Sequence, residues 1–449
     1  MPCVTLPAPL DHFVATITSL LDRRHAELFP PLFVGVLFGQ GRRTATSWFR
    51  AGGITEEFRR GYTLLGTLGR HWCELVAGSL FRRLRRTLPS GPRWVFALDD
   101  TPTQRYGPCV EGAGIHHNPT PGPTHQRYVY GHVWVTLAWV VRHPLWHTLA
   151  LPLLAHLYIR QADLPEIPVD HRPPFVTKLE QAAGQIHWLA EQLRDTTQPI
   201  WVVVDGFYGK RPVLKAARHD DVVVVGRLRK DAALRSVPPA VPPEQRGRGR
   251  PRVYGTQRFS LAKRAGHAQG WQTVECFQYQ QLVAKTVKTF LATWRPAGGV
   301  IRVVLVREDH GWVAFFGTDP AASVRDILEA AAGRTAVEET FKDVKEVEGA
   351  GQQQLRYGPA NLAAFCCCLW GYTAVEWWAW AKPFEQLCDR SASPWDDPTR
   401  RPSHADRRKA LQRQGLQEAF QRVWGERPCP PEIRAHLDAV LAWATGTGG

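Results

Sequence analysis

Residues 200–226 read IWVVVDGFYGKRPVLKAARHDDVVVVG, and this stretch decides how the rest of the chain is interpreted. Two valine-rich runs, at 200–205 and 221–226, flank a short basic segment at 210–218 that fits one helix. Continuous apolar runs are typical of strands that are buried on both faces, as in parallel sheets. The stretch therefore predicts a parallel β-α-β unit with Asp205 at the carboxyl end of its first strand.

The segments before this unit predict three strands and one helix. RWVFALDD (93–100) is a short apolar run, and residues 126–143 and 147–159 are rich in β-branched and aromatic residues. Three strands in sequence indicate an antiparallel start to a sheet. A helix is expected from Thr177, where T-K-L-E forms a capping box, to about Arg194. The predicted order is β-β-β-α-β-α-β.

The segments after the unit predict an insertion and a return to the core. Residues 229–255 are rich in Pro, Gly and Arg and read as a linker, followed by alternating segments typical of strands. A helix is expected to begin near Ser323, to be interrupted near Gly333, and to continue through RTAVEETFKDVKEVEG. The fold class is therefore α/β, with a mixed sheet that a β-rich insertion interrupts.

Composition limits the class of protein. The chain has 449 residues, enough for more than one domain, and 44% of them are hydrophobic. Lys and Arg number 56 against 41 Asp and Glu, and the net charge of +15 favours a polyanionic partner, first of all nucleic acid.

Cysteine usage and hydropathy point to the cytoplasm. The nine Cys contain no C-x-x-C pair, so we expect reduced, buried thiols and neither a disulfide framework nor a zinc knuckle. No signal peptide is apparent at the N-terminus, and residues 362–380 read as a core helix because Glu376 interrupts them.

Four acidic residues stand where carboxylates can converge. Asp99 and Asp100 end the first core strand, Asp205 ends the fourth, and Glu338 lies in the last core helix. Several anions at one point are unfavourable unless a cation neutralises them, and Mg²⁺ prefers oxygen ligands. Two such ions ~3.5–4 Å apart activate a water or a 3′-hydroxyl and stabilise the leaving oxygen of a phosphodiester. With the basic charge, this predicts phosphoryl transfer on nucleic acid.

These positions resemble the DDE transposases of bacterial insertion sequences, over roughly residues 93–380. That family has an RNase H-like catalytic fold with a β insertion before the Glu helix. Its cut-and-paste group carries Tyr, two residues, Arg, three residues, Glu, six residues, Lys, and Arg334, Glu338 and Lys345 have this spacing. The Tyr position is Ala331, which puts one DNA contact in doubt but no metal ligand. E-G-A-G at 348–351 also resembles the family.

The resemblance implies a transposase that binds terminal inverted repeats and uses two Mg²⁺ ions, with Mn²⁺ as a substitute, for DNA cleavage and strand transfer. The implied ligands are Asp100, Asp205 and Glu338. Asp100 is preferred to Asp99 because the family's first Asp commonly precedes a Thr, here Thr101. A homodimer on DNA, located in the cytoplasm at the nucleoid, is expected. The alternatives are a nuclease without strand transfer and a transposase-derived DNA-binding protein.

Further residues are predicted to contact DNA, each with a structural alternative. The cations of the Glu338 helix could instead form i,i+4 ion pairs, and the basic turn after Asp205 could simply be solvated. The R-G-R-P motif could be part of a flexible linker, and the tryptophan could pack in the core. The set is Arg334, Lys342, Lys345, Tyr208, Lys210, Arg211, Arg248, Arg250 and Trp294.

We expect five regions along the chain. Residues 1–90 form a helical DNA-binding region with arginine clusters at 42–43 and 82–86, although these arginines face the catalytic domain's own carboxylates in the competing interpretation. The other regions are the first catalytic part (91–228), the linker and insertion (229–320), the second catalytic part (321–381) and a basic C-terminal appendage (382–449).

Overall fold

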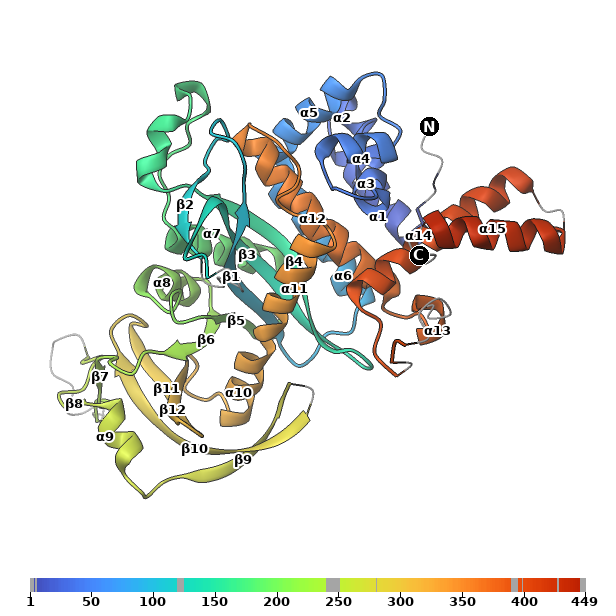
Figure 1. Cartoon of the computed structure of the whole chain (residues 1–449). Coiled ribbons are helices and arrows are strands. Elements are labelled where there is room, and N and C mark those ends of the chain that lie inside the picture. The colour runs from blue at the N-terminus through green and yellow to red at the C-terminus, as the bar shows by residue number, and fades with distance from the viewer. Residues whose placement is uncertain are drawn as a thin grey trace.

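The computed structural model describes residues 4, 6–118, 125–239, 251–279, 281–388, 395–397, 399–425 and 428–444. A mixed sheet of twelve strands runs through this part of the chain, with helices on both of its faces (Figure 1). The predicted α/β class, with helical segments at both ends of the chain, is confirmed.

Five strands form the centre of the sheet and follow the predicted order. β1 pairs antiparallel with β3, β3 with β4, and β1 and β6 both pair parallel with β5. This is the arrangement of an RNase H-like core. The strands are β1 (Trp94–Gln104), β3 (Tyr128–His143), β4 (His147–Tyr158), β5 (Ile200–Val204) and β6 (Val222–Leu228).

The insertion strands extend this same sheet. β12 pairs antiparallel with β6, and β11, β10, β7 and β8 follow in that order, while β9 pairs with β10. Hydrogen bonds therefore tie the insertion directly to the catalytic core. These strands are β7 (Leu234–Arg235), β8 (Arg258–Phe259), β9 (Gln272–Gln278), β10 (Gln281–Trp294), β11 (Gly299–Glu308) and β12 (Gly311–Gly317), and a short β2 (Gly114–His117) pairs with β3.

Helices cover the two faces of the sheet differently. Phe81 of α6 packs on Phe96 of β1 with ring centroids 5.6 Å apart, on the face that also receives α7 and α8. Val337 of α11 packs on Ala97 on the opposite face. The helices are α1 (Ala8–Leu20), α2 (Arg23–Ala26), α3 (Phe29–Phe38), α4 (Ala45–Ala51), α5 (Phe58–Thr67), α6 (Cys73–Thr87), α7 (Lys178–Gln192), α8 (Arg211–His219), α9 (Leu261–Gly266), α10 (Val324–Gly333), α11 (Thr335–Glu346), α12 (Gly358–Ala379), α13 (Phe384–Leu387), α14 (His404–Trp424) and α15 (Pro431–Ala444).

The apolar segment at 362–380 lies in α12, which packs along β4. The indole of Trp370 donates to the carbonyl of Leu153 (2.9 Å), and the hydroxyl of Thr373 donates to that of Pro152 (2.8 Å). The helix thus covers a sheet edge that would otherwise be open to other strands. None of the described helices combines the length and the apolar composition that crossing a bilayer requires. The Cys366–Cys368 thiols are buried, as expected, but Cys109 is exposed.

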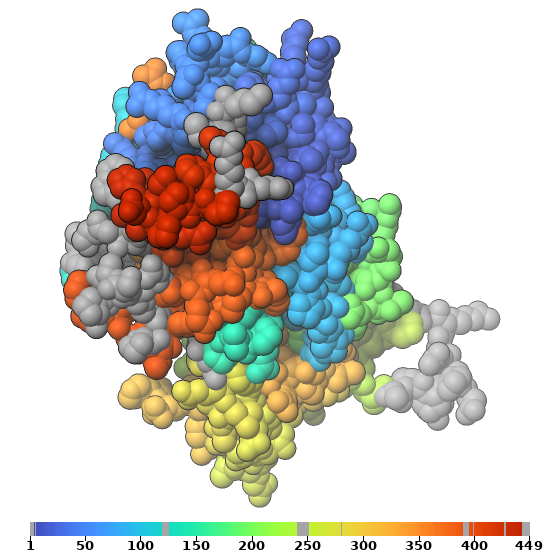
Figure 2. All heavy atoms as spheres, turned by 90° about the vertical axis from the view of Figure 1, so that its right-hand side faces the viewer, coloured from blue at the N-terminus to red at the C-terminus, as the bar shows by residue number. Residues whose placement is uncertain are grey.

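A buried ionic cluster fixes the C-terminal helices to the core. The ring nitrogens of His404 lie 2.6 Å from Glu376 and 2.9 Å from Glu348, and Arg407 and Arg408 pair with the same two carboxylates. Figure 2 shows the C-terminal segments against the N-terminal helices, where Arg408 donates to the carbonyl of Val36. The sequence indicated a polar appendage, but its helix α14 is anchored in the core.

His404 makes the stability of this cluster depend on pH. Burial lowers the pKa of His404, but hydrogen bonds with Glu348 and Glu376 outweigh burial and raise it above the ordinary value. The contribution to stability is therefore complete below about pH 6.5 and is lost as pH rises through the folded-state pKa. We expect the free energy of unfolding to fall with pH above this point, and His404→Gln to remove that slope.

The measurement is urea unfolding of parent and variant between pH 5.5 and 9. At pH 6, His404→Gln should be less stable by roughly 3–5 kcal/mol, because it removes one positive charge from between two buried carboxylates. His219→Gln, on an exposed side chain of α8, is the matched control and should change neither quantity. A variant that keeps the parent's pH slope would contradict the assignment.

Candidate active site

The pairing of β1 with β5 brings two aspartates together. Leu98 is paired with Val204, so the residues that follow, Asp99 and Asp205, come next to each other at the carboxyl end of β5. Side chains alternate between faces along a strand, and Ala97, two residues before Asp99, packs on α11. Asp99 and Asp205 therefore lie on the sheet face that α10 and α11 cover.

Asp100 points to the opposite face. Its carboxylate forms an ion pair with Lys178, the first residue of α7, and the Lys178 ammonium lies 5.3 Å from the ring centre of Tyr158 and 5.7 Å from that of Phe207. The expectation that Asp100 is a metal ligand beside Glu338 therefore conflicts with the strand geometry. The sequence favoured Asp100 because Thr101 follows it, but a neighbouring residue does not determine to which face of the sheet a side chain points. Lys178 was not predicted.

Arg334 joins the strand to the Glu helix. It stands between α10 and α11, where the predicted interruption near Gly333 is confirmed. One guanidinium nitrogen donates to Asp99 (2.5 Å) and the other to Glu338 (2.8 Å). The residue predicted to bind DNA thus holds two of the expected carboxylates, one on the strand and one on the helix.

The pKa of Asp99 is set mainly by burial of its carboxyl group. Burial raises the pKa of Asp99 to about 7, and the carboxylates of Asp205 and Asp100 act in the same direction. Arg334 and the Asp100 N–H oppose this rise without cancelling it. The Asp99 carboxylate would therefore be stabilised by more positive charge than the protein itself supplies.

The Asp205 side chain caps a turn and also lines a cavity. Its Oδ1 accepts the N–H groups of Phe207 (2.9 Å) and Tyr208 (3.0 Å), the turn-capping role that is common for an Asp after a strand. The carboxyl also lines a cavity of about 580 Å³ together with Arg334. The turn-capping role is therefore observed, and the role of Asp205 as a metal ligand stays a prediction.

Residues of the insertion complete this cavity. Tyr279 at the tip of the β9–β10 hairpin, Lys285 of β10 and Glu308 of β11 line it, beside Ala331 at the signature Tyr position. Tyr279 is 71% exposed. The sequence missed these residues because only strand pairing within the shared sheet places the hairpin over β5.

The donor set fits a hard divalent cation. Asp99, Asp205 and Glu338 offer carboxylate oxygens, which Mg²⁺ prefers, and burial raises the pKa of Asp99. Within the described residues no three His, Cys, Asp or Glu side chains are close enough to hold an ion as they stand. The Arg334 guanidinium, which bonds two of these carboxylates, accounts for their separation.

The predicted helix lysines differ in their surroundings. Lys345 is half-buried and donates to the hydroxyl of Thr101 (3.1 Å), two residues beyond Asp99 on the same face of β1. Lys342 has 69% of its side chain exposed and lies 4.0 Å from Glu346, the i,i+4 pairing of the structural alternative. Val337, Phe341 and Val344 form the buried face.

The basic turn after Asp205 is exposed, in contrast to two other predicted DNA contacts. Lys210 and Arg211 are on the surface, with Lys210 4.2 Å from the ring centre of Phe207. Tyr208 is fully buried, and Trp294 is only 9% exposed and packs on Phe316. For these two the expectation is corrected, because a buried side chain cannot reach DNA. Arg248 and Arg250 lie outside the described residues.

Part of the N-terminal arginine cluster is engaged within the protein. Arg85 forms two hydrogen bonds to Asp195 (2.8 and 2.7 Å), and Arg82 donates to Gln192 at the end of α7 (3.1 Å). For Arg85 the competing interpretation, contact with a carboxylate of the catalytic part, is the one observed, whereas Arg82 contacts a neutral amide there.

The sequence predicted that Asp99 and Asp100 end the first strand, but β1 continues to Gln104 because its pairing with β3 extends beyond its pairing with β5. An RNase H-like sheet with one carboxylate within β1 and another directly after β5 is the architecture of a nuclease. The chain belongs to the DDE superfamily endonucleases, whose family pattern matches residues 17–296. The matched region includes Asp99, Asp100 and Asp205 and ends before Glu338. Membership implies a DNA substrate and cleavage that generally depends on divalent metal ions. No curated protein matches the chain.

The burial of the Asp99 carboxyl group predicts a gain in stability when its charge is removed. Because the folded-state pKa of about 7 lies above the ordinary value of 3.8, ionisation of Asp99 opposes folding as pH rises between them. Without divalent metal, Asp99→Asn should exceed the parent in free energy of unfolding at pH 8 by up to about 4 kcal/mol, and not at pH 4.

Chemical unfolding in EDTA at both pH values checks this. Asp100→Asn is the matched control, since it loses the ion pair with Lys178 and should gain no stability at pH 8. An Asp99→Asn variant no more stable than the parent at pH 8 would show that Arg334 neutralises Asp99 completely.

Proposed function

We propose that this protein is a DNA transposase that binds terminal inverted repeats, cleaves DNA at the transposon ends and joins those ends to target DNA. The observation that carries the proposal is that Arg334 joins Asp99 to Glu338 on the sheet face where strand pairing places Asp205 beside Asp99. The net charge of +15 supports a long polyanionic substrate.

The metal ligands in this proposal are Asp99, Asp205 and Glu338, with Asp99 in place of the Asp100 favoured by sequence. Asp100 acts through its backbone and through Lys178, because its N–H donates to Asp99 (2.9 Å) and its carboxylate pairs with Lys178. We assign it as a positioning residue. Mg²⁺ is the proposed metal, with two ions per site and Mn²⁺ as a substitute.

Bound Mg²⁺ would lower the pKa of the attacking hydroxyl and stabilise the leaving oxygen of the phosphodiester. The chain's own residues would position the strand. When cations neutralise Asp99 and Glu338, the Arg334 guanidinium loses its partners and becomes available to a phosphate, which it binds through two parallel hydrogen bonds. Lys345 beside Thr101 and the exposed Lys342, Lys210 and Arg211 would add phosphate contacts around the site.

Transposition requires two ends to be joined in one event, so the proposed active form is a homodimer on DNA that acts in the cytoplasm at the nucleoid. Tyr279, exposed over the cavity that Asp205 and Arg334 line, would contact the DNA where the signature tyrosine is replaced by Ala331.

Amide variants test the ligand assignment. Asp99→Asn, Asp205→Asn and Glu338→Gln should each reduce Mg²⁺-dependent cleavage of a labelled transposon end by about 100-fold or more, because the charge that holds the ions is lost. Binding to the same duplex should stay within a few-fold. Asp100→Asn should cost only about tenfold, as expected for a residue that orients a ligand.

Glu346→Gln, on the exposed face of the same helix as Glu338, is the control and should cleave like the parent. If Asp100→Asn abolished cleavage while Asp99→Asn retained it, the assignment of faces would be reversed.

Strand transfer distinguishes a transposase from a nuclease of the same family. A labelled, pre-cleaved end with a free 3′-hydroxyl should become covalently joined to a supercoiled target plasmid in Mg²⁺, and Asp205→Asn should not join it. Cleavage without any joined product would favour the nuclease, and repeat binding without cleavage would favour a DNA-binding derivative.

A further inference from the structure

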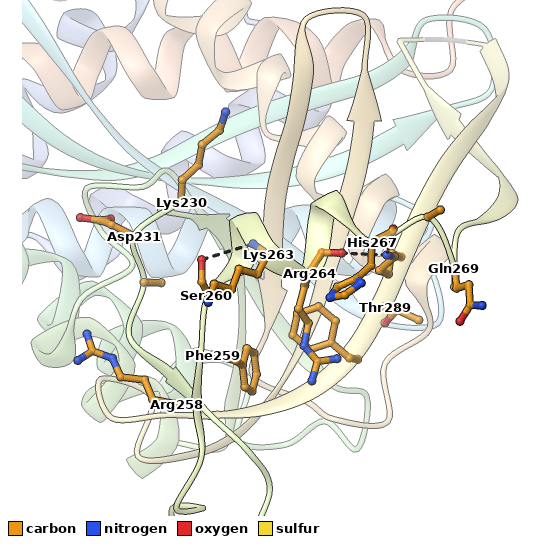
Figure 3. A pocket seen from close by; sticks show the side chains of 15 residues that line it. Lys230, Asp231, Arg258, Phe259, Ser260, Lys263, Arg264, His267, Gln269 and Thr289 are labelled. Carbon is orange, nitrogen blue, oxygen red and sulfur yellow. Dashed lines mark hydrogen bonds between the residues drawn. The ribbon is translucent and has the colours of Figure 1, made fainter.

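A second cavity, of about 960 Å³, lies in the insertion near the end of the sheet formed by β10, β7 and β8. Figure 3 shows its side chains, which come from the turn after β6, from β8, from α9 and from β10. The cations that line it are Lys230, Arg258, Lys263, Arg264 and Lys288. We call this cavity the insertion groove.

Negative charge within the protein does not balance these cations. Among the described residues that line the insertion groove, Asp231 is the one carboxylate, and it is already paired with Arg229 (3.0 Å). Arg258 and Lys263 are exposed. The groove is therefore a concave surface with a strong excess of positive charge.

Lys288 is the observation that points to a ligand. It is only 7% exposed, and its ammonium donates to the carbonyls of Arg264 (2.9 Å) and His267 (2.7 Å). An ammonium has three donors, and no carboxylate among the described residues pairs with this one. A buried charge without a counter-charge is unfavourable, and an anion in the groove would relieve it.

Aromatic rings hold the cations in place. The Arg264 guanidinium carbon lies 4.4 Å from the ring centre of Phe259 and 4.5 Å from that of Phe290, and the Lys288 ammonium lies 4.9 Å from that of Trp271. Such contacts fix a side chain before the ligand arrives. Because these rings are occupied by the protein's own cations, the groove offers charge rather than stacking surfaces for bases.

We propose that the insertion groove binds the phosphodiester backbone of duplex DNA. This inference rests on the proposed function, since it names a further contact with the same DNA. Val287 of β10 packs with α10, so its neighbour Lys288 points to the opposite sheet face, away from Asp99 and Asp205. Four strand-to-strand steps, about 20 Å, separate β5 from β10. The continuous sheet would keep this arrangement constant, so the groove would hold a part of the DNA that lies away from the cleavage point.

The test compares full-length Arg258→Gln/Lys263→Gln with the parent in binding to a transposon-end duplex across a salt series. Each lost phosphate contact removes about 0.9 from the slope of log affinity against log salt, so the slope should fall by about 2, and affinity at 100 mM salt roughly tenfold or more. Lys215→Gln/Arg194→Gln, two exposed cations on α8 and after α7, is the charge-matched control and should behave like the parent.

Cleavage measured at saturating DNA should be the same in parent and groove variant, since the groove holds no catalytic carboxylate. A parent that cleaves DNA and a groove variant with an unchanged slope would overturn the groove and leave the proposed function standing. A parent that binds without cleaving, with a reduced slope in the variant, would support the groove and reject the proposed function. Inorganic phosphate bound by the parent and lost in the variant, with the DNA slope unchanged, would assign the groove to a small anion and overturn the proposal.

Discussion

The parallel pairing of β1 with β5 is the constraint on which the site depends. It sets Leu98 against Val204, so that Asp99 within β1 and Asp205 directly after β5 lie next to each other on the same face of the sheet. Because a shift of one residue would turn every side chain to the other face, the apolar packing of Ala97 on α11 also fixes the direction of Asp99. Core packing and placement of the carboxylates are therefore one and the same requirement.

Charge balance explains why the two neighbouring aspartates differ. On the sheet face that α10 and α11 cover, Arg334 binds Asp99 and Glu338. On the opposite face, Lys178 binds Asp100. Burial keeps the pKa of Asp99 raised even though Arg334 pairs with it. A carboxyl group with so strongly shifted a pKa is typical of a functional site.

Two contacts outside the site give the core its fixed shape. The pairing of β12 with β6 merges the insertion with the catalytic sheet, so a surface near β10 cannot move independently of β5. At the other end, the ionic cluster around His404 joins α14 to α12 and to the turn after α11. Since the cluster is buried, its loss would leave uncompensated charges, and α14 is therefore part of the folded unit rather than a loose tail.

The sequence alone determined the order of core strands, the capping box at Thr177, the interruption near Gly333 and the apolar face of α11, because each depends on local periodicity or capping. Only the tertiary structure decided which of Asp99 and Asp100 faces the Glu helix, that Tyr208 and Trp294 are buried, and that Glu376 pairs with His404. These outcomes depend on strand register and on contacts between residues far apart in the chain, which no local pattern encodes.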